Sequence, residues 1–106
     1  MTALSCAALF FSGVLLPVEP TYKNVFEKII QPKCVGCHDR SGLGGLDLSD
    51  FASLMAFPGM VTAGSPEKSL LWDSVNSGRM PLGYKLESWE IHLLREWILQ
   101  GGKETP

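Results

Sequence analysis

Apolar and polar residues along most of the chain recur with the period of an α-helix. The first such segment follows Thr21, a residue type that caps helix N-termini, and runs to Pro32, which cannot continue a helix. At about 100° per residue its apolar positions share one face and its charged positions the other. The apolar positions are Tyr22, Val25, Phe26, Ile29 and Ile30. The pattern predicts an amphipathic first helix that ends at Pro32.

Helix signals recur three more times. A short helix is predicted from Ser49 or Asp50 to about residue 56, and another opens at Ser65-Pro66 and ends at Gly78. The last begins near residue 87 and ends at paired glycines, residues 101–102. No period-2 run is convincing. The predicted class is all-α, with three to four short helices and glycine-rich loops.

The first 18 residues follow a different pattern, because they contain no charged side chain. We expect an export signal or a retained membrane anchor over 1–18 and a folded domain over 19–106. A signal peptide fits the apolar length, although no Lys or Arg precedes the run. A membrane helix of this length would span about 27 Å, which is marginal for a hydrocarbon core of about 30 Å. Lipidation at Cys6 is a third interpretation, beside a small apolar role for that cysteine.

Composition narrows the class of function. Nine Lys and Arg balance eleven Asp and Glu, for a formal net charge of -2, so no basic patch points to a nucleic acid partner. Three cysteines, with only one closely spaced pair, argue against a disulfide framework. A domain this small still needs a covalent link or a cofactor to stabilise it in addition to its apolar core.

The closely spaced pair lies in the run Cys34-Val35-Gly36-Cys37-His38, which matches the attachment signature of c-type haem. Two residues between the cysteines allow both sulfurs to reach the two vinyl groups at one edge of the ring. The next residue then supplies the imidazole that binds iron. We expect Cys34 and Cys37 to attach one haem c covalently and His38 to ligate its iron. The covalently attached haem would provide this additional stabilisation.

Two other kinds of site use closely spaced cysteines. A zinc site would need two more ligands, and only Cys6 and His92 remain, neither at zinc-ligand spacing. A redox dithiol of the thioredoxin kind would follow a strand within a βαβ unit, which the pattern does not show. Haem attachment is the preferred interpretation.

The second axial ligand is predicted to be Met80. It lies in a Gly-Arg-Met-Pro loop just before the last helix, where Gly78 and Pro81 shape the backbone. Met55 lies in an apolar helix, where we expect it to fill the core. Met60 is a weaker candidate, and His92 falls opposite the apolar face of the last helix, beside Arg95 and Glu96. Arg79 and Lys85 are candidates either to pair with haem propionates or to lie in solvent. Trp72 and Tyr84 are candidates either to hydrogen-bond a propionate or to fill the core.

These pieces together resemble the monohaem c-type cytochromes, and especially the small cytochrome c domains of planctomycetes. The matching pieces are FEKIIQPKCVGCH, GGLDLS, GSPEKSLLW, RMP and LREWILQGG, in that order over about residues 22–102. Many relatives have Met-Pro-Pro where this chain has Met80-Pro81-Leu82. The resemblance implies an all-α cytochrome c fold around one covalent haem. In that fold Phe26 and Ile29 would pack against Leu94, Trp97 and Ile98.

The predicted ligand set indicates the function. Imidazole and thioether leave no open position on the iron, and the soft sulfur favours the ferrous state. We expect an electron carrier, not an enzyme, that passes one electron between a redox donor and an acceptor in the bacterial periplasm. One alternative is a fixed subunit of a membrane respiratory or photosynthetic complex, anchored by 1–18. Another is a gas-binding or peroxidatic haem protein.

Overall fold

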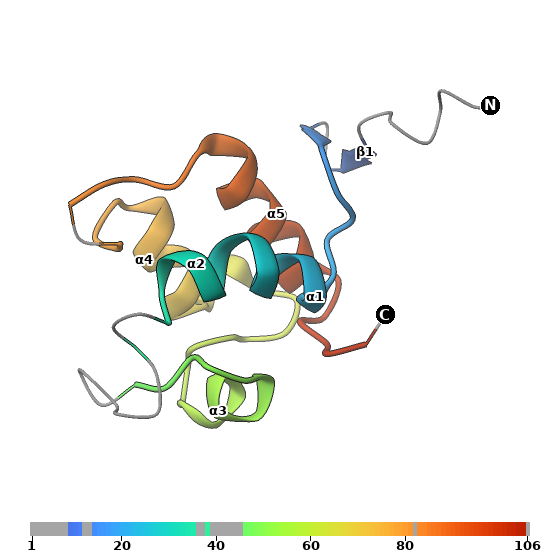
Figure 1. Ribbon diagram of the computed structural model, residues 1–106. Coiled ribbons are helices and arrows are strands. Elements are labelled where there is room, and N and C mark those ends of the chain that lie inside the picture. Colours follow the sequence, from blue (N-terminus) through green and yellow to red (C-terminus); the bar gives the residue numbers. More distant parts are fainter. Residues whose placement is uncertain (1–8, 12–13, 36–37, 39–45, 82, 106) are drawn as a thin grey trace.

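A short hairpin leads into a bundle of short helices in the computed structural model, which describes residues 9–11, 14–35, 38, 46–81 and 83–105 (Figure 1). Strand β1 is Leu9–Phe11 and β2 is Val14–Leu16, paired antiparallel with Leu9 opposite Leu16. The helical elements are α1 (Tyr22–Val25), η2 (Phe26–Ile30), α2 (Gln31–Lys33), α3 (Phe51–Ala56), η4 (Pro66–Lys68), α4 (Leu70–Asn76) and α5 (Ser88–Leu99). The predicted all-α class is confirmed.

The first helix is continuous through α1, η2 and α2. The Thr21 side chain accepts a hydrogen bond from the Asn24 backbone N–H at 3.2 Å, as expected of the predicted cap. The helix runs one residue past Pro32, to Lys33, so its predicted end was early. The π-helical turn of η2 explains the difference. Its wider turn relieves the contact between a proline ring and the carbonyl four residues earlier.

The other helices begin close to their predicted caps. Asp50 accepts a hydrogen bond from the Ser53 backbone N–H at 2.7 Å and starts α3. The segment from Ser65 is divided into η4 and α4, because the buried Ser69 hydroxyl interrupts the helix and donates to the Ser65 carbonyl at 2.9 Å. Helix α5 ends before Gly101, whose φ of 115° favours glycine.

The core gathers around α5, which packs against α1, α4, η4 and β2. In Figure 1 the first helix crosses α5, and the β1–β2 hairpin and α3 lie on opposite sides of the first helix. The buried hydrophobic residues are Leu16, Val25, Ile29, Ile30, Leu48, Leu54, Met60, Leu71, Val75, Leu86, Leu93, Leu94, Trp97 and Ile98. The first helix therefore packs on the last through α1, and the expected contact of Phe26 and Ile29 with Leu94, Trp97 and Ile98 stays a prediction. Phe26 is only partly buried and lies beside the Tyr22 ring.

Part of the N-terminal apolar segment joins this core. Leu16 on β2 is fully buried, whereas Leu15 is 54% exposed, as alternating side chains on a strand require. Pro20 is also buried, and the Glu19 carbonyl accepts from the Asn24 side chain at 2.9 Å. The sequence pattern predicted no strand here. The division of the chain at residue 18 stays a prediction. Across the residues described, no helix has the length and apolar character needed to cross a membrane.

Candidate functional site

The cysteine-histidine motif begins where the first helix ends. The Cys34 backbone N–H donates to the Ile30 carbonyl at 2.9 Å, and the His38 N–H donates to the Cys34 carbonyl at 2.9 Å. A bond across four residues is the spacing of one helical turn, so it holds Cys34 and His38 one above the other. Both residues are partly buried. Gly36 and Cys37 lie outside the described residues, as does Cys6.

A further bond fixes the far side of the motif. The Leu48 backbone N–H donates to the His38 carbonyl at 2.6 Å, and the Leu48 side chain belongs to the core. His38 is therefore held by the helix end on one side and by a core residue on the other. A ligand for iron needs such a fixed backbone, because the ring must meet the metal at one orientation.

An ion pair joins this helix end to the start of α5. Lys33, the residue before Cys34, donates to Glu90 Oε2, while Glu90 Oε1 accepts from the Glu87 backbone N–H at 2.8 Å. Glu87 and Glu90 form a capping box at the N-terminus of α5. The sequence pattern did not predict this pair. Its signal was the Glu-x-x-Glu pattern before an apolar run, but nothing local indicated the lysine partner.

Met80 lies on the loop that leads to the same end of α5. Its backbone N–H donates to the Ser74 carbonyl at 3.1 Å, and its side chain is 38% exposed. Because Lys33 contacts Glu90 in the first turn of α5, the motif and this loop approach the same helix terminus. Met80 as the iron ligand stays a prediction. Leu82, in the same loop, lies outside the described residues.

The other ligand candidates lie in different surroundings. Met60 is a core residue. Met55 is 36% exposed, so the expectation that it fills the core was wrong: only Leu54 of the six-residue α3 is buried. His92 and Arg95 are partly buried and Glu96 is buried, so this side of α5 is less open to solvent than the pattern predicted. The packing of β2 against α5 reduces its open surface.

Three of the four candidate propionate partners either contact another residue or are exposed to solvent. Arg79 binds Asp73 at 2.7 Å, Lys85 lies against Gly78, and Tyr84 is exposed. The exception is Trp72, whose indole N–H is buried without a hydrogen-bond partner among the described residues. An orphaned buried donor of this kind suits an anionic or oxygen-bearing group that the polypeptide does not supply.

Two charged side chains lie in succession beside the Trp72 ring, first Arg95 and then Glu67. The Arg95 guanidinium lies 5.7 Å from the centre of the Trp72 ring and binds Glu67 at 2.8 Å. The Arg95 hydrogen bond lowers the pKa of Glu67. These contacts hold the indole in place between α4 and α5.

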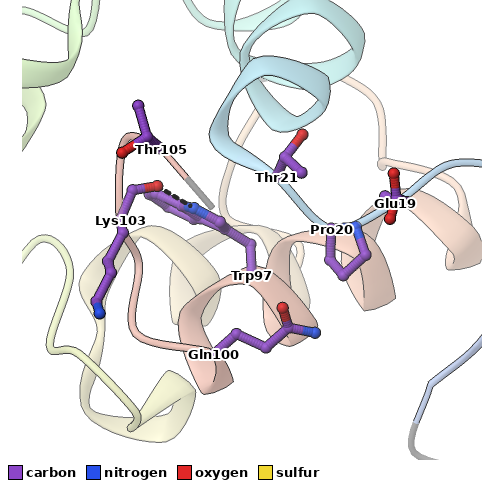
Figure 2. Close-up of a pocket in the computed structure, with 7 residues that line it drawn as sticks. All are labelled: Glu19, Pro20, Thr21, Trp97, Gln100, Lys103 and Thr105. Carbon is purple, nitrogen blue, oxygen red and sulfur yellow. Dashed lines mark hydrogen bonds between the residues drawn. The ribbon is translucent and has the colours of Figure 1, made fainter.

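A separate groove of about 470 Å³ lies at the opposite end of the first helix (Figure 2). Figure 2 shows the Trp97 ring between Lys103 and Pro20, with the indole N–H donating to the Lys103 carbonyl at 2.9 Å. The groove begins near Thr21, about 20 Å of helix away from Cys34 at ~1.5 Å per residue. Among the residues that the structure describes, its lining includes no cysteine, histidine or methionine. It is therefore distinct from the region of the motif.

The residue types of the motif suit a c-type haem. Within the described part of the chain, no group of three or more His, Cys, Asp or Glu side chains is placed to hold a metal. The sequence of the motif offers two thiols for covalent attachment and an imidazole, and Met80 offers a thioether, which are the groups that a c-type haem requires. The residues present fit that group.

Comparison with known proteins identifies the same region. Residues 34–81 match the model of the family described as planctomycete cytochrome C. The match starts at Cys34 and ends at Pro81, so it spans the motif and Met80. No curated protein and no solved structure matches the chain.

Proposed function

We propose that this chain, which contains a cytochrome c-like domain over the matched residues, passes single electrons between extracytoplasmic redox partners through one covalently bound haem c. The cytochrome c family indicates electron transfer, covalent haem and redox partners in general. The observation that carries the finer proposal is the extent of the match, because it begins at the first attachment cysteine and ends beside the candidate methionine ligand.

Cys34, Cys37 and His38 of the motif, together with Met80, would hold the cofactor. Each cysteine would add its S–H group across a haem vinyl group to form a thioether. His38 and Met80 would supply an imidazole nitrogen and a thioether sulfur to the iron. When bound, the haem iron supplies a reversible one-electron couple. Two protein ligands then leave no position for substrate, and the thioether raises the reduction potential.

The N-terminal segment would place the domain outside the cytoplasm, either as a cleaved export signal over 1–18 or as a retained anchor. The domain over 19–106 would meet its electron donor and acceptor there. The second candidate is a fixed subunit of a membrane complex, in which residues 1–18 would be retained. Retention would keep Leu16, which is buried in the core and which cleavage after residue 18 would remove.

Replacement of Met80 tests the ligand assignment. We expect Met80→Ala to keep covalent haem, to lower the reduction potential and to bind carbon monoxide in the reduced state. Met55→Ala is the matched control, because Met55 is similarly exposed and lies in a different element. An unchanged ferric spectrum and potential in Met80→Ala would show that Met80 is not the ligand. Rapid carbon monoxide binding by the unmodified protein would favour the gas-binding alternative.

Mass spectrometry of the native protein tests attachment and processing together. The intact mass should show one haem, and the N-terminus should begin at Met1, at a lipidated Cys6 or near Glu19. Cys37→Ser should lose one thioether bond and most of the holoprotein, whereas Cys6→Ser should keep both thioether bonds. A normal yield of doubly attached haem in Cys37→Ser would contradict the attachment assignment.

A further inference from the structure

The ion pair between Lys33 and Glu90 is the most buried of those formed by the described residues. The side chains of Lys33 and Glu90 are 24% and 4% exposed, whereas those of Arg79 and Asp73 are 56% and 50% exposed. Charges interact more strongly where little water separates them, and salt screens a buried pair less than an exposed one. The charges of Lys33 and Glu90 therefore act on their surroundings more strongly than surface charges do.

The Glu90 carboxylate is held in place through both of its oxygens. Oε2 accepts a hydrogen bond from the Lys33 ammonium, and Oε1 accepts from the Glu87 backbone N–H at 2.8 Å. Glu90 also lies in the first turn of α5, where the helix dipole favours a negative charge. These contacts orient the carboxylate toward the end of the first helix.

Lys33 lies where the proposed haem would be joined to the chain. It is the last residue of α2 and directly precedes Cys34, so their Cα atoms are about 3.8 Å apart. The Cys34 and Val35 backbone N–H groups both donate to the Ile30 carbonyl, at 2.9 and 3.0 Å, and hold this end of the helix. A haem bonded to Cys34 would therefore lie near both charges of the ion pair.

We propose that Glu90 lowers the reduction potential of the haem by cancelling the positive charge of Lys33. Oxidation adds one positive charge to the iron, so an uncompensated ammonium group beside the cofactor would favour the reduced state. Paired with Glu90, the ammonium contributes little net charge, and the oxidised state is easier to reach. This inference rests on the proposed function, because it takes Cys34 as a point of haem attachment, but it does not require Met80 as the iron ligand.

Redox titration of the holoprotein at neutral pH and low ionic strength measures the effect. Glu90→Gln removes the charge but keeps an oxygen that can accept from the Glu87 backbone N–H. We expect it to raise the ratio of reduced to oxidised haem about tenfold at a fixed electrode potential, which is a rise of about 59 mV in midpoint potential. Lys33→Met combined with Glu90→Gln removes both charges and should return the ratio to within about twofold of the unmodified protein.

Two further variants separate the effect of charge from an effect on structure. Glu27→Gln removes a carboxylate from an exposed position of the same first helix, and should change the ratio less than about twofold because water and salt screen that charge. Lys33→Met alone leaves the charge of Glu90 uncompensated and should shift the ratio toward oxidised haem. This variant tests the same claim with the opposite sign if Glu90→Gln yields too little folded holoprotein, and an unchanged or raised potential in it would contradict the proposal.

Three other outcomes would overturn the proposal. If Glu90→Gln lowers the free energy of unfolding but leaves the midpoint potential unchanged, the ion pair acts only on stability. If the raised potential persists in the double variant, it does not come from the charge of Lys33. If Glu27→Gln shifts the potential as much as Glu90→Gln does, the effect is not specific to the ion pair. Failure of the proposed function is separate, because the intact mass of the unmodified protein would then show no covalently bound haem.

Discussion

The first helix meets α5 in two different ways at its two ends. At its start, the Tyr22 ring lies 5.7 Å from that of Trp97 and 5.0 Å, edge-on, from that of Phe51. At its end, beside the cysteine-histidine motif, Lys33 pairs with Glu90. One crossing is thus held by aromatic rings far from the motif and by an ion pair next to it.

The two ends of the first helix therefore have different roles, one in the stability of the fold and one in the position of the chain at the motif. Aromatic side chains remove large apolar areas from water, and each such residue contributes strongly to folding. A largely buried ion pair gains little net free energy, because both charges lose hydration, but breaking it on one side is costly. We infer that the aromatic end stabilises the crossing, whereas the ion pair fixes where the chain leaves the helix for Cys34.

The largest expected effect is at the aromatic end. Trp97→Ala should lower the free energy of unfolding by about 3–5 kcal/mol, because Trp97 is almost fully buried and contacts Tyr22. Guanidinium unfolding of the holoprotein measures the loss. Trp97→Phe keeps a ring and should lose clearly less. A loss below about 1 kcal/mol in Trp97→Ala would mean that the aromatic end does not carry the stability of the crossing.

A smaller effect is expected at the ion pair. Glu90→Ala should lower the free energy of unfolding by about 1–3 kcal/mol, since it leaves the Glu87 N–H and Lys33 without their partner. Lys33→Met combined with Glu90→Ala should recover part of this loss, because no unpaired lysine remains. If the double variant is as unstable as the sum of the single variants, the two side chains are not coupled.

The smallest effect appears only in alkali. Burial, followed by the carboxylates of Asp50 and Glu104, raises the pKa of Tyr22 from 10.0 to about 12. The folded state therefore prefers the neutral phenol. Its stabilising contribution is complete below pH 10 and is lost as the pH rises through about 12. Absorbance titration should show a phenol step near pH 12 that is missing in Tyr22→Phe. A step that persists in this variant would assign the raised pKa elsewhere.

Local signals predicted most of the helices. Thr21 and Asp50 cap as their residue types suggest, and paired glycines follow α5. The division around Ser69 could not be predicted, because its hydroxyl bonds depend on how the loop at Thr62 packs. Likewise Leu15 and Leu16 are the same residue type in sequence. Only the pairing of β2 and its packing on α5 decide which one is buried.

The candidate site likewise has a part that could be predicted from the sequence and a part that could not. The motif from Cys34 to His38 could be predicted from sequence because its five residues are contiguous, and its use for haem attachment stays a prediction. Its support was not readable, since Lys33 and Glu90 are 57 residues apart in sequence. The Gly78–Lys85 contact needed the loop to return to α4. Sequence spacing thus predicts the groups that bind a cofactor, but tertiary packing decides what holds them still.

Leu16 is buried in the core and also lies in the N-terminal segment proposed for export. Export and folding would therefore require this side chain in different places. Under the proposed export, a chain still held by its N-terminus during translocation cannot place Leu16 in the core. Completion of the core would then wait for release of that segment. Cleavage after residue 18 would remove the leucine and leave its space beside α5 to be refilled, whereas cleavage ahead of β2 would preserve it. The maturation site would therefore determine the packing of the finished domain.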